Sequence, residues 1–318
     1  MRRALAPTVA VLLLHATTAG ATEPLEFNLS QLGAPTQEAW TALGVSDPAA
    51  AKAAADDAKK RFASFSIQTL MAMSSSLLIP ASTTGHSGFD IAFEASYTGV
   101  DPKVIGSNVA LGPPLNATFT AVGPFPSHHM TPYELTVMSL HVRKSLPFSL
   151  EFGGRLMYLA QSATYGTQLE AKWALNEGLA NLPDIALRIA HTRAVGTLAW
   201  NAGVTEFDVL VSKRFGVNAV ASLTPYGAAR FSFVNASSSD MSWSVNPAAP
   251  AGIVAAFPTL NTTIYRTTLG LRFTTYAVSL AAEGTYFAGA SVGSDSGNYP
   301  KQSLKASWGG AARLGFEF

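Results

Sequence analysis

Residues 148–158, with the sequence FSLEFGGRLMY, alternate between two chemically different sets of side chains. The even-numbered positions are apolar or Gly, whereas the odd-numbered positions include Glu151 and Arg155. Successive side chains of a β-strand point to opposite faces. The stretch therefore predicts a strand with one apolar face and one polar face.

The same period of two recurs from residue 89 to residue 318. In residues 89–97, FDIAFEASY, the odd positions are apolar or small, and the even positions include Asp90 and Glu94. A water-soluble sandwich also alternates, so the pattern within one strand does not show whether its apolar face meets a core or a lipid bilayer. Further apolar series on one parity contain Leu169, Leu187, Val209, Phe233, Leu271 and Leu280.

The connections between these segments distinguish the two folds. Short links fall at residues 144–147, 181–184, 214–217 and 274–276, and mostly longer ones lie between them, at 99–131, 162–165, 193–201, 235–262 and 289–301. Short periplasmic turns alternating with longer external loops are typical of transmembrane barrels. The sequence predicts an all-β fold, an antiparallel transmembrane β-barrel of about ten strands with both barrel ends on the periplasmic side. Twelve strands stay open, because residues 104–122 could form another hairpin.

Composition supports a membrane protein without spanning helices. Charged residues make up 13% of the chain, about half the usual quarter, and no later segment provides the roughly 20 apolar residues of a spanning helix. A net charge of +1 gives no electrostatic footprint for nucleic acid. Without Cys the chain has neither disulfides nor thiolate metal sites.

The first residues are typical of a signal peptide. Arg2 and Arg3 precede an apolar stretch at residues 4–14, and Ala19, Gly20 and Ala21 form a cleavage pattern. We expect a signal peptide at residues 1–21, an N-terminal extension at 22–85, and the barrel at 86–318.

The last residues, 303–318, alternate in the same way and end on Phe318. This resembles the C-terminal assembly signal of Gram-negative outer-membrane β-barrels. The resemblance implies an outer-membrane location, an assembly signal at Trp308, Leu314, Phe316 and Phe318, and outer-membrane lipid, the barrel-assembly machinery and periplasmic chaperones as partners. Residues 80–89 and 143–148 also look like stretches in uncharacterised barrel proteins of myxobacteria, a likeness that implies no activity. The oligomeric state stays open.

A helix is predicted at Pro48–Met73, because Asp47 can cap it and Pro48 suits its first position. Its second half is too apolar to face water. We favour a periplasmic helix that packs under the barrel mouth. The alternative is a hatch inside the lumen, like the N-terminal plugs of the long-chain fatty-acid transporter family, but a ten-stranded lumen is tight for a helix.

The polar parity predicts which charged side chains line the lumen. Acids and bases nearly balance, so we expect a salt-bridged interior in preference to a pore lining with little ion selectivity. Glu134 and Glu317 share this parity. The predicted lumen-lining residues are Asp90, Glu94, Glu151, Arg155, Glu170, Lys172, Arg188, Glu206, Asp208, Arg230, Arg266, Arg272, Glu283, Lys305 and Arg313.

Three functions follow from this architecture. The leading hypothesis is a small gated pore or transporter for small or hydrophobic solutes, with apolar loop stretches at 109–115 and 251–257 to catch a ligand. The alternative is a structural or surface-binding barrel with a closed lumen. An outer-membrane lipid hydrolase or protease is the least favoured, because neither His141 nor His191 belongs to a nucleophile motif. His128 and His129 lack the further ligands of a metal site, and no metal or cofactor is predicted.

Overall fold

The computed structural model describes residues 29–74, 76–100, 134–160, 164–179, 181–197, 199–243, 253–294 and 297–318. The predicted signal peptide, the apolar stretch at 109–115, the possible hairpin at 104–122, and His128 and His129 lie outside these ranges.

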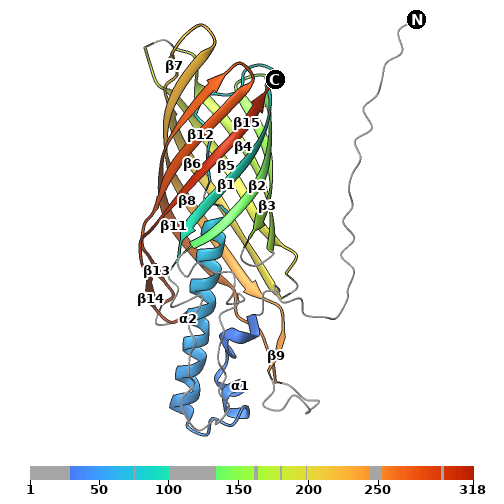
Figure 1. Cartoon of the computed structure of the whole chain (residues 1–318). Helices are drawn as coiled ribbons and strands as arrows, with labels where there is room; N and C mark the ends of the chain where they lie inside the picture. Colours follow the sequence, from blue (N-terminus) through green and yellow to red (C-terminus); the bar gives the residue numbers. More distant parts are fainter. Residues whose placement is uncertain are drawn as a thin grey trace, which may run out of the picture.

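Ten long strands form a closed antiparallel barrel (Figure 1). Each strand pairs with its neighbours along the chain, and the last pairs with the first, so the sheet has no free edge. The predicted ten-stranded barrel is confirmed. The strands are β1 (Phe89–Gly99), β2 (Glu134–Leu146), β3 (Leu150–Leu159), β4 (Thr164–Asn176), β5 (Asp184–Val195), β6 (Trp200–Ser212), β8 (Ala221–Ser238), β11 (Leu260–Thr275), β12 (Val278–Phe287) and β15 (Ser307–Glu317).

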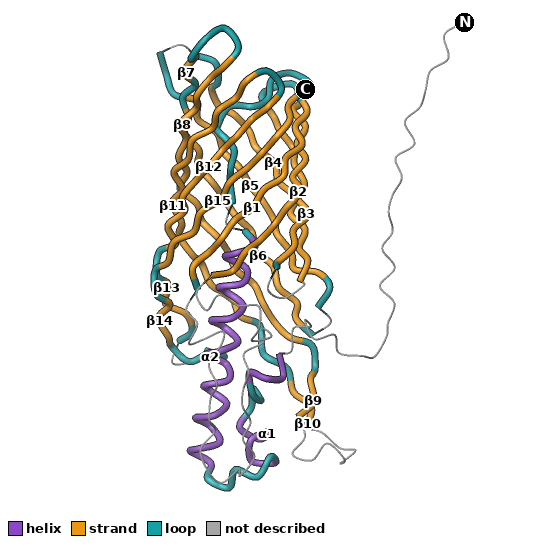
Figure 2. Tube along the Cα trace, viewed as in Figure 1, coloured by secondary structure: helices purple, strands orange, loops and turns teal. Residues whose placement is uncertain are grey.

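The two ends of the barrel differ. At the short-turn end lie the β2–β3, β4–β5, β6–β8 and β11–β12 connections, the start of β1 and the end of β15. The other connections define the long-loop end, where two of them form hairpins beyond the wall (Figure 2). These hairpins are β9 (Met241–Trp243) with β10 (Ile253–Ala255), and β13 (Ala290–Val292) with β14 (Gln302–Leu304). A short strand, β7 (Phe215–Gly216), extends one turn at the opposite end.

Burial alternates along the barrel strands as the sequence predicts. Phe152, Leu187, Val209 and Leu271 are exposed on the outer surface, whereas the intervening charged side chains are buried inside. Exposed aromatic side chains gather near both ends, where they can sit at the two interfaces of a bilayer. Near the long-loop end these are Tyr97, Tyr265 and Trp308, and near the short-turn end Phe148, Tyr276 and Phe318.

Between residue 29 and the barrel the structure has the helices η1 (Leu29–Leu32), α1 (Gln37–Ala42) and α2 (Pro48–Met73). The predicted bounds of α2 are confirmed, and the Asp47 side chain accepts a hydrogen bond from Ala49 N at 2.9 Å. None of the described helices is both long and apolar enough to cross a membrane. The helices lie at the long-loop end (Figure 1).

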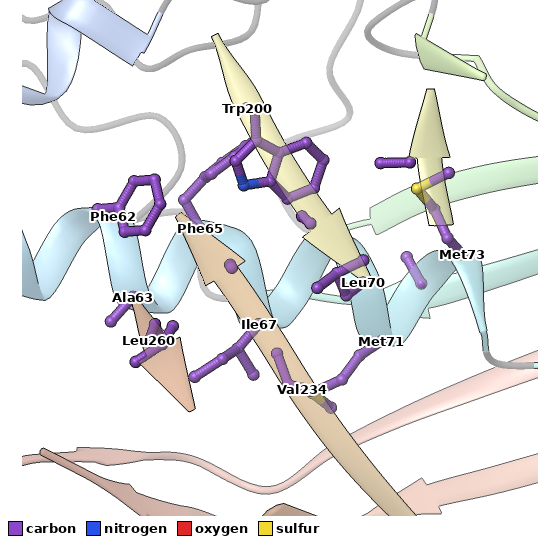
Figure 3. Packing of buried hydrophobic residues seen from close by; sticks show 14 of the residues in the cluster. Phe62, Ala63, Phe65, Ile67, Leu70, Met71, Met73, Trp200, Val234 and Leu260 are labelled. Atoms are coloured by element: carbon purple, nitrogen blue, oxygen red, sulfur yellow. The ribbon is translucent and has the colours of Figure 1, made fainter. Parts of the chain in front are cut away.

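The sequence predicts this helix under the mouth at the end where β1 starts, whereas the structure places it in the mouth at the opposite, long-loop end. The second half of α2, from Phe62 to Met73, is buried around its whole circumference, as a helix inserted into a protein interior must be. It packs in the mouth of the barrel (Figure 3). The Phe62 ring stacks on Phe257 with centroids 4.4 Å apart, and Phe65 contacts Trp200 at 5.3 Å.

Candidate functional site in the barrel lumen

An extended stretch of the chain runs through the lumen between α2 and β1. We call residues 76–84 the lumen segment. It leaves the helix near the long-loop end, and Thr84 reaches Ser145 and Glu151 near the short-turn end. Nine residues reach at most about 30 Å when fully extended, against an apolar band of roughly 25 Å in such barrels. A helix would need about 20 residues for that distance. The tight lumen thus contains extended chain, and the helix stays at its mouth.

Basic side chains of the barrel bind main-chain carbonyls of this stretch at every second residue. Arg266 donates to Ser74 O at 3.0 Å and Arg155 to Ser76 O at 3.0 Å. Further along, Arg313 donates to Leu78 O at 3.4 Å, and Lys172 donates to Pro80 O at 3.3 Å and to Ser82 O at 2.9 Å. A carbonyl that has no partner strand is satisfied in this way by a charged donor, which makes a stronger hydrogen bond than a neutral one.

Acidic and hydroxyl side chains bind the N–H groups of the same stretch. The two oxygens of Glu283 accept from Leu77 N and Leu78 N, each at 2.6 Å. Leu78 has a φ of 54°, in the left-handed region that lets successive N–H groups converge on one anion. Ser212 accepts from Ala81 N at 3.0 Å and Glu177 from Thr83 N at 2.7 Å. The carboxylates thus act as acceptors for the main chain.

A row of apolar side chains, three of them Ala, makes room for the segment. Ala174, Ala186, Leu210 and Ala228 are direct partners across the four adjacent strands β4, β5, β6 and β8. They form one apolar cluster with Tyr226 and the side chains of Leu77, Ile79 and Ala81. Larger side chains at these positions would fill the space that the segment occupies.

Buried ion pairs fill much of the remaining lumen and share their partners. Asp90 pairs with Arg143 and Arg313, and Glu206 pairs with Arg230 and Arg266. Since removing a charge from water costs several kcal/mol, such sharing keeps each buried charge compensated. Further pairs join Glu94 to Arg155, Glu151 to Arg143 and Lys172, Arg188 to Glu170 and Asp208, Asp208 to Arg230, and Arg272 to Glu317.

The structure places every predicted lumen-lining residue inside the barrel except Lys305. Lys305 is exposed between β14 and β15, because the alternation of the final residues continues past the barrel wall into the hairpin. Glu134 is likewise exposed, at the rim. The four residues of the predicted assembly signal, Trp308, Leu314, Phe316 and Phe318, all lie exposed on the outer side of the wall.

Sequence reasoning missed several residues of the lumen. Arg143 and Gln168 are buried there, and the parity of β2 and β4 could have identified both. The lumen segment itself has no alternation with charged residues, and Pro80 and Gly85 made it look like an ordinary linker. The signal that could have revealed it is the row of small inward residues at Ala174, Ala186 and Ala228.

The two candidate catalytic histidines have different surroundings. His141 is buried in the lumen, where its Nδ1 lies 2.9 Å from Glu94 and its Nε2 lies 2.9 Å from Glu170. His191 faces outward, and its Nδ1 lies 2.9 Å from the Thr205 hydroxyl. Among the described residues no group of three His, Asp or Glu side chains is placed to hold a metal ion.

A closed antiparallel barrel with an apolar outer surface, aromatic side chains near both ends and a polar interior is a transmembrane β-barrel of the bacterial outer membrane. No protein family and no curated protein matches the sequence.

Three solved outer-membrane or barrel structures are similar to this chain at low sequence identity. The translocator domain of autotransporter NalP from Neisseria meningitidis is 9% identical with a TM-score of 0.39, covering 83% of this chain and 98% of that one. The N-terminal barrel domain of Pseudomonas aeruginosa OprF is 12% identical with a TM-score of 0.29, covering 74% and 99%. The KdgM porin is 6% identical with a TM-score of 0.30, covering 72% and 99%. At these values the similarity has no bearing on function.

Proposed function

We propose that this protein is a structural or surface-binding outer-membrane barrel whose lumen is closed by its own N-terminal extension. The observation that carries the proposal is the lumen segment, which occupies the lumen along its length and is bound by both signs of charge. A passage that is filled by extended chain and by paired side chains offers solutes no continuous aqueous path.

The seal at the long-loop end supports the same function. Gln302 donates through its side-chain amide to Lys60 O on α2 at 3.2 Å, and the Tyr299 hydroxyl donates to Pro258 O. Burial raises the pKa of Tyr299, so its hydroxyl keeps its proton and this hydrogen bond at neutral pH. Helix and hairpins thus form one packed cap over the mouth.

Conductance measurements on the intact protein test closure. We expect the protein in planar bilayers to show no steady conductance, because the lumen segment and α2 block the lumen. Heat-modifiable migration in gels confirms that the barrel is folded. A stable open level in most insertions, growing in proportion to salt concentration, would contradict a closed lumen.

A pair of glutamate variants identifies what closes the lumen. In Glu283→Ala the N–H groups of Leu77 and Leu78 lose their acceptor, so we expect transient openings at least several-fold more frequent than in the intact protein. Glu134→Ala removes an exposed carboxylate at the rim and should leave the baseline unchanged. Equal behaviour of the two variants would mean that the segment does not form the barrier.

A gated pore for small solutes is the second candidate, favoured by the charged lining and by the reversible nature of the contacts that hold the segment. Voltage-dependent openings of the intact protein, together with liposome swelling in small sugars, would support it. Capture of a hydrophobic solute by the described end of the 251–257 stretch has less support, because Phe257 is already buried against Phe62. Hydrolysis has less support still, since the buried His141 is enclosed by the occupied lumen.

A further inference from the structure

The lumen forms most of its hydrogen bonds to the segment with main-chain atoms. Four carbonyls of the segment, those of residues 76, 78, 80 and 82, accept from Arg or Lys, as does that of Ser74 at the end of α2. The N–H groups of residues 77, 78, 81, 83 and 84 donate to Glu or Ser side chains. These main-chain groups are the same in every residue except Pro, so the hydrogen bonds recognise the backbone, while the side chains of Leu77, Ile79 and Ala81 pack in the apolar cluster of the lumen wall.

The segment also has a direction across the membrane. Ser74 and Ser76 lie toward the long-loop end, whereas Thr84 lies at the short-turn end beside Ser145. Short turns of outer-membrane barrels face the periplasm and long loops face the outside. The chain therefore enters the lumen from the external side and leaves it at the periplasmic side, where β1 begins.

From this geometry we propose that the lumen is a channel for a polypeptide segment bound through its main chain, through which the N-terminal extension of this chain reaches the outer face. The proposal deepens the closed-barrel function and rests on it. Residues 29–73, including α1 and α2, then lie on the external side of the barrel, with the second half of α2 buried in its mouth, and the cargo of the barrel is its own chain.

Single cysteines test where residues 29–73 lie, since the natural chain contains no Cys. Ala53 is exposed on α2, Val217 is exposed in the turn between β6 and β8, and Ile79 is fully buried in the lumen. A membrane-impermeant maleimide is added to intact cells carrying Ala53→Cys, Val217→Cys or Ile79→Cys in the full-length protein. A periplasmic thiol protein in the same cells reports whether the outer membrane stays sealed.

We expect Ala53→Cys to react in intact cells, and Val217→Cys to react only after the outer membrane is permeabilised. Ile79→Cys should react only after denaturation, because the closed lumen protects it. Reaction at Val217→Cys but not at Ala53→Cys in sealed cells would overturn the proposal, and so would protection of Ala53→Cys until permeabilisation. Maleimide labelling tests the position of residues 29–73, whereas conductance tests whether the lumen is closed, so failure of one proposal is distinguishable from failure of the other.

Paired substitutions in the segment test recognition of the backbone. Leu77→Pro and Ala81→Pro each remove an N–H donor, whereas Leu77→Ala and Ala81→Ser keep it and change only the side chain. We expect transient conductance at least several-fold more frequent in each proline variant than in its partner. Equal conductance within both pairs would overturn recognition through the backbone. If one proline variant fails to become heat-modifiable, the other pair decides the question. If both proline variants fail while their partners fold, the barrel needs the N–H contacts in order to form around the segment, as the proposal requires.

Discussion

Arg188 shows how single residues hold the interior together. Its side chain is completely buried and forms ion pairs with Glu170, at 2.7 Å, and with Asp208. Each of these carboxylates has a further partner, His141 or Arg230. The guanidinium, whose planar donors suit two carboxylates at once, thus joins two branches of the lumen network.

Replacing Arg188 by Met should reduce the free energy of unfolding by about 3–5 kcal/mol, because two buried carboxylates lose a partner. Urea unfolding in lipid vesicles measures this change. The matched control is Arg193→Met on the same strand, where an exposed side chain donates to Asn201 at 3.2 Å, and the expected change is within about 0.5 kcal/mol. Equal effects of the two substitutions would show that water reaches the network and screens it.

At the scale of elements, β15 and β1 close the barrel at its last residues. Phe318 N donates to Phe89 O at 2.8 Å, and Phe89 N donates to Phe318 O at 2.9 Å. The Phe318 ring itself stays outside the wall and is 72% exposed. The main chain of Phe318 thus belongs to the seam, whereas its ring does not, and we propose that the ring carries the assembly signal.

Phe318→Ala separates these two roles, because it keeps both main-chain hydrogen bonds and removes the ring. We expect the variant to fold in vesicles in vitro but to yield several-fold less heat-modifiable protein in cells, since the proposed assembly signal loses its terminal ring. Tyr276→Ala, which removes an exposed aromatic ring at the same end, should assemble normally. Normal assembly of Phe318→Ala, with loss only on deletion of the residue, would assign the whole effect to strand pairing.

Helices and strands were predictable from the sequence where a local pattern of residues defines them. The cap at Asp47 and the helix formers after it define α2, and alternation defines the barrel strands and their inward charges. Alternation fails at Lys305, because a hairpin continues the pattern beyond the wall. The position of α2 was not predictable, since it depends on the path of the lumen segment, whose main-chain contacts carry no sequence pattern.

At the scale of the whole molecule, the outer surface shows how the barrel sits in a bilayer. Leu269 is 75% exposed and lies near the middle of β11, where it pairs with Gly284 of β12. Tyr265 lies four residues nearer to the long-loop end on the same outward face, and its ring contacts Phe231 with centroids 5.3 Å apart. The two side chains therefore report different depths on one strand.

Arginine at these two positions should have unequal costs. At the bilayer midplane an outward Arg destabilises a barrel by about 2–4 kcal/mol, and near an interface by about 0–1 kcal/mol, because there the guanidinium reaches water. We expect Leu269→Arg to reduce the free energy of unfolding in vesicles by the larger amount and Tyr265→Arg by the smaller amount. In detergent micelles, which deform around a charge, the difference should shrink. If Tyr265→Arg were the costlier substitution in vesicles, the bilayer would be centred nearer to the long-loop end, and α2 would lie partly within the interface and not beyond it.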